Sequence, residues 1–426
     1  MRAAFYECDV TPPIGGYLWG YYSRRISEDV SERLYAKAVI IEDEGNIAAL
    51  VSVDACSLPE EMHDIVTQRI YNYTGIKPEN VCISATHTHK GVPIFSSPEI
   101  DCFKDEAYTD VFYRLTADAV ILAYKRLGEE AVEVTYGTSF VDGVSFNRNA
   151  VTNDGTYVTH PRWRDDVVSV LDEVDKSLNI ITFSKNGKKI GSIINFSLHL
   201  DSTGRGMWYS SDYAGIISDV LKEKYGNSFV SLFVTGACGD VNHMIHDENI
   251  EVNNHKTIGK ILGSEAIKVI ESSSIVSGSV CSFKETISIE KRSPNEKEYN
   301  KLSDERSGRS SDSLVVLAYL RYAYTNKETH ADLKMQIIKI GDICICALPG
   351  EIYTRTGLNI KQKSPFEKTI IVENSNCYCG YIPTENAFEE NSRLYEAALC
   401  NHSCLVPEAA QIIEEKALSM IEKIKE

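Results

Sequence analysis

The chain has 426 residues, of which 43% are hydrophobic and 25% charged, a composition typical of a globular protein with a large core. Its formal net charge of −17 argues against a nucleic acid or an anionic membrane surface as an obligate partner. No run of about eighteen apolar residues predicts an integral membrane segment, and residues 1–16 show no signal-peptide pattern, so we expect a cytoplasmic protein.

Strands and helices alternate along the sequence. Apolar runs bounded by turn residues predict strands at 3–10, 36–42, 47–53, 81–83, 131–136, 141–145, 179–184, 190–198, 231–235, 280–289, 333–348 and 369–373. Helical spacing of apolar residues predicts helices that begin near 212 and 351 and others at 59–74, 105–127, 254–272, 294–326 and 407–426. No internal repeat is evident. This alternation predicts one large domain of the α/β class (mixed α+β), with a large mixed β-sheet core covered by helices.

The twelve cysteines are scattered, and several lie inside apolar strand-like runs such as 343–347. Without a signal peptide, free thiols are expected rather than a disulfide framework. The spacings at 377–379 and 400–404 differ from the usual zinc-site spacing of Cys-x-x-Cys. We therefore interpret these cysteines as small buried hydrophobic residues.

Polar residues recur where predicted strands end. Active sites of α/β proteins tend to lie at strand ends, whereas scattered structural polar residues have no reason to prefer them. The residues concerned are Asp54, His87, His199, Asp240, Glu351 and Tyr381. Their recurrence predicts a functional site at the strand ends.

His87 and His89 lie one residue apart after the apolar run 81–83. In an extended segment their side chains would point the same way, and neutral imidazole is the commonest zinc ligand in proteins. An isolated motif of this kind is more often a pair of hydrogen-bonded loop histidines. The metal interpretation therefore depends on the rest of the chain.

Several short stretches resemble the neutral/alkaline ceramidase family and occur in that family's order. They are Ala-Thr-His-Thr-His at 85–89, Asn-Arg at 147–148, Glu-Val-Asp-Lys at 173–176, Gly-Asp-Val at 239–241, Pro-Gly-Glu at 349–351 and Gly-Tyr-Ile at 380–382. The resemblance covers most of the chain but only the family's N-terminal catalytic domain. It implies a single ceramidase-like catalytic domain over residues 1–426, without the family's immunoglobulin-like C-terminal domain.

The resemblance implies a zinc-dependent amidase. Its zinc ligands would be His87, His199, Glu351 and Tyr381. Two imidazoles and a carboxylate are the usual ligand types of catalytic zinc, and a bound cation favours the phenolate form of a tyrosine. Such a metal would lower the pKa of a bound water and polarise a carbonyl oxygen.

The resemblance also implies which residues surround the scissile amide. His89 would lie beside the metal, and Arg148 and Tyr395 would face the amide. A guanidinium and a phenol are suitable donors for a developing oxyanion. Asp240 is expected to hold its loop or a neighbouring histidine.

Two further acids and two further histidines have less defined roles. Asp54 is either an acid near the site or a capping or hydrogen-bonding group, and Asp212 is predicted to cap a helix. His243 and His246 could suggest a second metal site, but we expect loop histidines there.

The main departure from the family follows the Gly-Asp-Val stretch. Ceramidases continue with Ser-Pro-Asn, whereas this chain continues with Asn242 and His243. Asn242 cannot be a nucleophile, but its amide can donate and accept hydrogen bonds. This favours direct attack by a metal-activated water, with Asn242 positioning the substrate or the oxyanion. The departure weakens the transfer of ceramide as substrate more than it weakens the transfer of the metal chemistry.

We therefore expect a zinc-dependent hydrolase that cleaves a C–N amide bond of an N-acylated small molecule. An esterase, or a hydrolase of a modified sugar or another polar metabolite, stays open as an alternative. A non-catalytic metal- or ligand-binding protein is the alternative of another class. The expected partner is a small-molecule substrate, and the sequence leaves the oligomeric state open.

Overall fold

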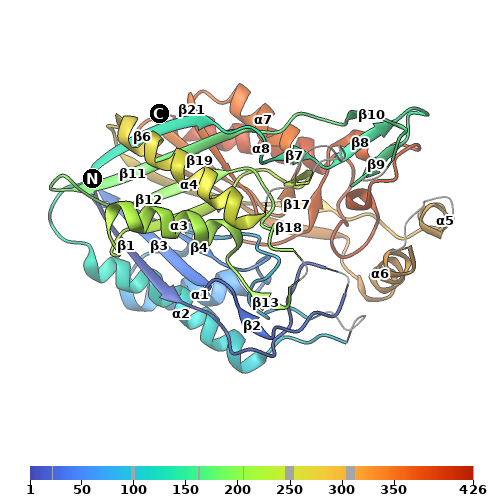
Figure 1. Cartoon of the computed structure of the whole chain (residues 1–426), viewed down its shortest axis with the longest axis horizontal. Helices are drawn as coiled ribbons and strands as arrows, with labels where there is room; N and C mark the ends of the chain where they lie inside the picture. The colour runs from blue at the N-terminus through green and yellow to red at the C-terminus, as the bar shows by residue number, and fades with distance from the viewer. Residues whose placement is uncertain are drawn as a thin grey trace.

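The structure is a computed structural model that describes residues 1–21, 23–96, 101–161, 164–204, 206–244, 254–303 and 312–425. Its sheets and helices form a mixed α+β architecture (Figure 1), which confirms the predicted fold class.

One order of elements occurs three times: three strands, a helix, a fourth strand and a second helix. The first copy comprises β1 (Arg2–Asp9), β3 (Tyr35–Asp43), β4 (Asn46–Val53), α1 (Met62–Thr74), β5 (Val81–Ala85) and α2 (Glu106–Arg126). The second comprises β6 (Glu133–Phe140), β11 (Ser177–Lys185), β12 (Lys188–Phe196), α3 (Asp212–Tyr225), β14 (Val230–Thr235) and α4 (His255–Ser272). The third comprises β17 (Val280–Glu290), β18 (His330–Ile340), β19 (Ile343–Ala347), α7 (Thr354–Lys363), β21 (Lys368–Val372) and α8 (Ala409–Lys423).

Each copy also has the same sheet order. The strands follow the orders β1-β3-β4-β5, β6-β11-β12-β14 and β17-β18-β19-β21, with β16 (Ser274–Ile275) added beside β6. In each of these four-strand orders the last two strands are parallel and the other neighbours are antiparallel. The β core is thus divided among three mixed sheets. No repeat is evident in the sequence because the repetition lies in the order of elements and not in residue identity.

Two-residue turns join the second and third strands of every copy: Glu44-Gly45, Asn186-Gly187 and Gly341-Asp342. Both residues of the first two turns have positive φ, between 50° and 88°, and Gly341 has a φ of 60°. Two-residue turns with such φ values match the right-handed twist of the flanking strands. Local sequence therefore fixes the register of all three hairpins.

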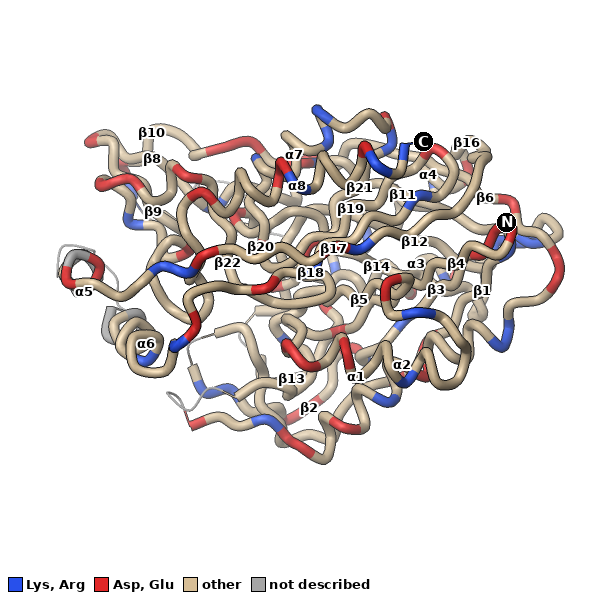
Figure 2. Tube along the Cα trace, turned by 180° about the vertical axis from the view of Figure 1, so that it is seen from behind, with Lys and Arg blue, Asp and Glu red and all other residues tan. Residues whose placement is uncertain are grey.

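The longer connections leave each sheet from one edge. The first, third and fourth strands of a copy run in the same direction, so their carboxyl ends lie together. Those connections contain the remaining elements: β2 (Asp29–Val30), η1 (Pro78–Asn80, which lies before β5), β7 (Phe146–Asn147), β8 (Asn149–Thr152), β9 (Tyr157–Thr159), β10 (Val167–Val170), β13 (Trp208–Tyr209), β15 (Val241–Asn242), α5 (Glu296–Ser303), α6 (Asp312–Thr325), β20 (Glu351–Ile352), β22 (Tyr381–Ile382), η4 (Glu385–Phe388) and η5 (Tyr395–Ala397). Both chain termini lie at the opposite end of the molecule (Figures 1 and 2).

The fourth strands of the three copies, β5, β14 and β21, end against one another. Thr235 Oγ1 donates to Thr86 O at 2.8 Å, and Glu373 N donates to Thr235 O at 2.9 Å. Ala85 N donates to Asn374 O at 3.0 Å. These hydrogen bonds close a ring in which the end of each fourth strand donates to the next. We call it the strand-end ring, and it fixes the three carboxyl ends relative to one another.

An apolar cluster fills the space between the sheets, and helices cover their outer faces. The central cluster draws residues from all three sheets, among them Leu50, Ile193, Leu232, Ile345 and Ile370. The pairs α1/α2, α3/α4 and α7/α8 contribute buried apolar side chains to separate outer clusters. Burial of this kind is the main favourable term in folding.

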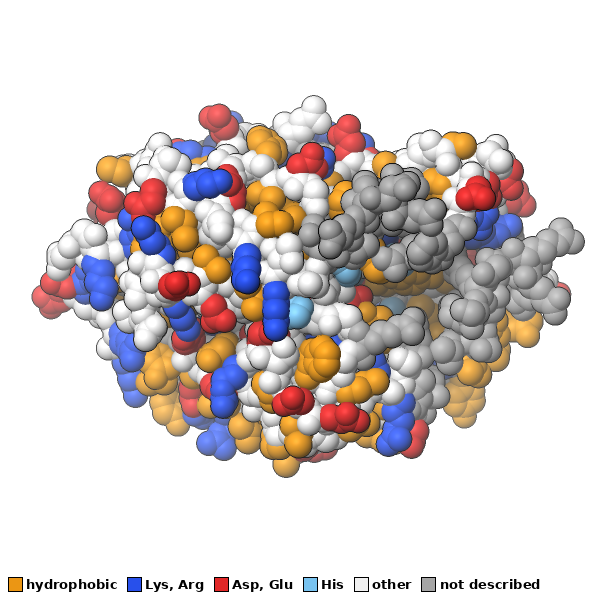
Figure 3. All heavy atoms as spheres, in the orientation of Figure 1, with side chains coloured by type: hydrophobic (Ala, Val, Ile, Leu, Met, Phe, Trp, Pro, Cys, Tyr) orange, Lys and Arg blue, Asp and Glu red, His pale blue; other side chains and the backbone are white. Residues whose placement is uncertain are grey.

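The outer surface carries charge of both signs. Acidic and basic residues are interspersed along the trace and over the visible face (Figures 2 and 3). Among the helices of the described chain, none combines the length and hydropathy that a bilayer crossing requires.

Asn195 of β12 provides a test of how the copies are joined. Its Nδ2 donates to Val234 O at 3.1 Å in its own sheet and to Ile371 O at 2.9 Å in the third copy. We expect Asn195→Ala to lower the free energy of unfolding by about 2–3 kcal/mol, because two buried carbonyls lose their donor. Urea denaturation measures this change.

Ser192, on the same strand, is the matched control. Its buried hydroxyl has no hydrogen-bond partner among the described residues. Ser192→Ala should therefore change the free energy of unfolding by less than about 0.5 kcal/mol. Equal losses in the two variants would contradict a bridging role for Asn195.

Candidate metal centre and active site

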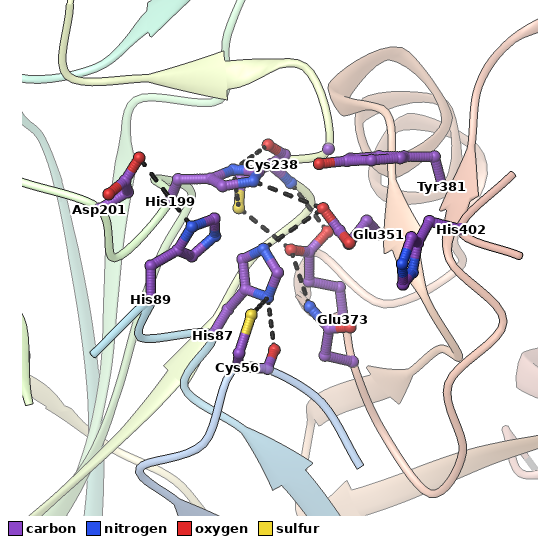
Figure 4. A network of polar contacts seen from close by, with 12 residues as sticks. Cys56, His87, His89, His199, Asp201, Cys238, Glu351, Glu373, Tyr381 and His402 are labelled. Atoms are coloured by element: carbon purple, nitrogen blue, oxygen red, sulfur yellow. Dashed lines mark hydrogen bonds and ion pairs between the residues drawn. The ribbon is translucent and has the colours of Figure 1, made fainter. Parts of the chain in front are cut away.

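Each of the three copies contributes at least one of the predicted metal ligands. His87 follows β5, His199 follows β12, and Glu351 begins β20 shortly after β19. Their exposed fractions are 2%, 0% and 2%, and their ligand atoms lie within 4.8 Å of one another. Figure 4 shows the two imidazoles and the carboxylate pointing toward one another. Histidine side chains are also visible in a hollow on the face shown in Figure 3.

A cysteine carbonyl orients each imidazole. The Nδ1 atoms of His87 and His199 lie 2.5 Å from Cys56 O and 2.8 Å from Cys238 O. Because a carbonyl only accepts, each Nδ1 carries a proton, and the neutral form of each imidazole would offer its Nε2 lone pair to the site. The thiol sulfurs of the same cysteines lie 3.8 and 3.4 Å from these Nδ1 atoms.

The backbone around His87 differs from the expected extended segment. Strand β5 ends at Ala85, and His87 has a φ of 69°, in the left-handed region that non-glycine residues rarely adopt. Hydrogen bonds hold this conformation, since His87 N donates to Ala55 O at 2.9 Å. His89 nevertheless reaches the site, with its ring centroid 5.0 Å from that of His87.

Glu351 lies between the two imidazoles. Its Oε2 is 3.3 Å from His87 Nε2 and 3.4 Å from His199 Nε2, and its Oε1 accepts from Tyr378 Oη at 3.0 Å. Burial acts to raise the pKa of Glu351, but the imidazoles outweigh it and hold that pKa well below its usual range. Burial, followed by the Arg148 and His87 charges, lowers the pKa of His199 to about 3. His199 is therefore a neutral imidazole.

These atoms fit a bound divalent metal. Within the described chain, His87 Nε2 and Glu351 Oε2 are buried without a hydrogen-bond partner. Buried polar atoms of this kind are costly unless a ligand satisfies them. Two imidazole nitrogens and one carboxylate oxygen form a donor set suited to zinc. The lone pair of His199 Nε2 also has a neighbour, because Arg148 Nη1 lies 3.3 Å away.

Two tyrosines flank Glu351. Strand β22 pairs in parallel with β20, and this register sets Tyr381 opposite Glu351. The Tyr381 ring extends toward the site (Figure 4), and its hydroxyl lies 3.1 Å from the hydroxyl of Tyr395. Tyr378, not Tyr381, hydrogen-bonds the carboxylate. The ligand role of Tyr381 stays a prediction.

Arg148 is fixed by its neighbours. Its Nε donates to Glu396 Oε1 at 2.9 Å, and its Nη2 donates to Gly239 O at 2.7 Å. The guanidinium carbon lies 5.5 and 5.3 Å from the ring centroids of Tyr381 and Tyr395. The structure thus gathers Arg148 and both phenols beside the predicted ligands.

His89 occupies another side of the site. It is buried, and neither ring nitrogen has a hydrogen-bond partner among the described residues. Its Nδ1 lies 4.0 Å from Asp201 Oδ2, and the hydroxyl of Tyr21 donates to Asp201. The imidazole can therefore donate or accept a hydrogen bond to a molecule bound in the site.

Asn242 and Asp240 lie in the connection after β14. Asn242 is buried in β15, and its Oδ1 accepts from Met244 N at 3.2 Å. Its role toward a substrate stays a prediction. Asp240 accepts from Thr354 N at 2.8 Å and from Asn147 Nδ2 at 2.8 Å, so its carboxylate holds the start of α7 and strand β7.

The remaining predicted acids are structural. Asp54 accepts from Tyr35 N at 2.8 Å and from Thr86 Oγ1 at 3.1 Å, so the hydrogen-bonding alternative holds. Ser211, not Asp212, is the N-cap of α3; Asp212 is an acid of the first turn of that helix, and its carboxylate accepts from Tyr213 N at 2.7 Å and from Ser202 N at 2.8 Å. His246 lies outside the described residues.

Sequence reasoning missed several residues of this centre. Cys56, Cys238, Glu373, Tyr378 and Glu396 all contact a predicted site residue or the backbone beside one. The first three follow the ends of β4, β14 and β21. The position of these three residues at strand ends could have identified them, but their residue types did not suggest a role in the site.

Two histidines and one carboxylate are thus buried together at the strand ends of a mixed α+β fold. Residues 6–257, more than half of the chain, match the family described as neutral/alkaline non-lysosomal ceramidase, N-terminal. The chain belongs to this family.

The chain is also similar to curated relatives and to a solved structure. The neutral ceramidase of Drosophila melanogaster is 24% identical over 253 residues, which are 55% of this chain and 35% of that protein. Neutral ceramidase A of Dictyostelium discoideum is 27% identical over 218 residues, or 50% of this chain and 30% of that protein. The chain thus matches about a third of the length of these relatives. The neutral ceramidase structure from Pseudomonas aeruginosa superposes with a TM-score of 0.74 at 18% identity, covering 99% of this chain and 74% of that one, which shows a shared fold.

The Arg148–Glu396 pair provides a second test. Both side chains are buried, so Glu396→Gln leaves a guanidinium without its carboxylate partner. We expect the free energy of unfolding to fall by about 3–5 kcal/mol, measured by urea denaturation. Thr159→Val is the control, because it removes a hydroxyl that donates to Glu396 Oε2 at 2.7 Å. Its expected cost is about 1 kcal/mol, and a similar loss in both variants would contradict the ion pair's importance.

Proposed function

We propose that the chain is a zinc-dependent hydrolase that cleaves the C–N amide bond of an N-acylated molecule. The observation that carries this proposal is the convergence of His87, His199 and Glu351 from three separate sheets, with ligand atoms within 4.8 Å of one another. Membership of the ceramidase family supports the choice of an amide bond.

In this proposal His87, His199, Glu351 and Tyr381 hold the zinc ion. When bound, the ion would supply a Lewis acid for the amide carbonyl and lower the pKa of a bound water. The carbonyls of Cys56 and Cys238 keep a proton on each Nδ1, and so keep both Nε2 atoms available.

The chain's own groups would bind and orient the amide. Arg148 presents a fixed positive charge, and the hydroxyl of Tyr395 is a donor beside it, 3.1 Å from the hydroxyl of Tyr381. Donors fixed before reaction stabilise a developing oxyanion without reorganisation. His89 offers ring nitrogens that can hydrogen-bond the substrate from the other side.

The relatives named neutral ceramidase suggest an N-acylated lipid as one substrate class. Asn242, where ceramidases carry a serine, favours a direct reaction with water over a serine nucleophile and leaves room for a more polar substrate. A panel of ceramide analogues, N-acyl amino acids, N-acyl sugars and matched esters would separate these classes. Cleavage of esters but of no amide would overturn the proposed bond.

Metal content provides the direct test. Purified protein reconstituted with zinc should hold about one zinc ion per chain, as in other catalytic zinc sites, and Glu351→Ala should lose both zinc and amidase activity. Elemental analysis and an amide-hydrolysis assay measure the two losses. Glu367→Ala, which removes an exposed carboxylate of the same copy, is the control and should retain both. Wild-type protein that binds no zinc after reconstitution would refute the site.

Tyr395→Phe tests the proposed oxyanion donors. It deletes one hydroxyl of the Tyr381–Tyr395 pair and keeps the ring. We expect kcat to fall about 100-fold with little change in KM, because the donor acts on charge that develops in the transition state. Steady-state kinetics measure both constants. Tyr157→Phe, whose hydroxyl lies 3.4 Å from Glu389 Oε2, is the control and should leave kcat unchanged.

A further inference from the structure

Glu373 is a fully buried carboxylate next to the predicted metal centre. It follows β21 and has an exposed fraction of 0%. Its Oε2 accepts from Cys238 N and from Ile352 N, each at 3.0 Å. Its Oε1 accepts from Cys238 Sγ at 3.0 Å and from Asn374 Nδ2 at 3.4 Å. Four donors thus converge on one carboxylate.

Two of these donors are backbone N–H groups next to predicted ligands or to their supporting carbonyls. Cys238 is the residue whose carbonyl binds Nδ1 of His199, and Ile352 directly follows Glu351. One carboxylate therefore fixes the second copy's histidine and the third copy's glutamate relative to each other. The backbone of Glu373 also belongs to the strand-end ring, because its N–H donates to Thr235 O. Glu373 therefore joins the end of its own strand, β21, to the end of β14.

We propose that Glu373 is a positioning residue that sets the affinity of the centre for its divalent metal. It acts through the backbone, by holding His199 and Glu351 at the separation that metal binding needs. This inference rests on the metal site of the proposed function. Glu373 itself contributes no ligand atom.

Two substitutions test this action. Glu373→Gln keeps the length of the side chain but replaces one acceptor oxygen with a donor NH₂ group. Glu373→Asp keeps both oxygens but is one methylene shorter, so it cannot reach Cys238 N and Ile352 N with the same geometry. Asn179→Leu is the control, because it removes buried hydrogen bonds to Tyr136 and Thr138 that touch no predicted ligand.

The experiment measures zinc affinity directly, by competition with a chromophoric chelator, on full-length apo protein of each variant. We expect Glu373→Gln to weaken zinc binding about 10- to 100-fold and Glu373→Asp to weaken it less, as for other groups that orient metal ligands. The absorption bands of the cobalt-substituted protein should shift in both variants. Asn179→Leu should lower thermal stability but leave zinc affinity and the cobalt spectrum unchanged.

The outcomes distinguish this inference from the proposed function. Wild-type affinity and an unchanged cobalt spectrum in both Glu373 variants would overturn the inference while the zinc site stands. Equal weakening in Asn179→Leu would also overturn it, since general destabilisation would then explain the effect. A wild-type protein that binds no zinc would refute the proposed function itself. If Glu373→Gln fails to fold, Glu373→Asp supports the same comparison.

Discussion

The strand-end ring is the constraint on which the rest of the structure depends. Three hydrogen bonds between Thr235, Thr86, Glu373, Ala85 and Asn374 join the carboxyl ends of β5, β14 and β21. Because connections leave each sheet from that same edge, the ring determines where every loop of the centre begins. A buried backbone group must find a partner, and here each copy supplies the partner that its neighbour lacks. The contacts between the ends of β5, β14 and β21 therefore set the position of the candidate metal centre.

Local features of the fold were readable from the sequence, whereas the docking was not. The turns Asn186-Gly187 and Glu44-Gly45 specify hairpins within a few residues. The apolar residues of α2 recur with helical spacing along the 21 residues of that helix. The threefold order of elements escaped notice because each copy satisfies the same pattern with different residues. Contacts such as Asn195 Nδ2 to Ile371 O join positions far apart in the chain, and no local pattern encodes them.

The residues of the candidate site likewise divide into those that the sequence revealed and those that it did not. His87, His199 and Glu351 could be named because histidines and a glutamate at strand ends are unusual and match short family-like stretches. Cys238 and Glu373 could not, since one acts through its carbonyl and the other through hydrogen bonds to backbone N–H groups. Residue type carries no information about a backbone carbonyl. The left-handed conformation of His87 could not be predicted from the sequence either, because only the surrounding hydrogen bonds select it.

The distribution of the three ligands over three copies has a mechanical consequence. An ion held by all of them would act as a non-covalent cross-link between segments separated by more than a hundred residues of sequence. Opening any one copy would then require release of the ion, so ion binding would couple the unfolding of all three copies into one cooperative event. The same geometry would make ion capture a late step of folding, since no single copy contains the centre on its own.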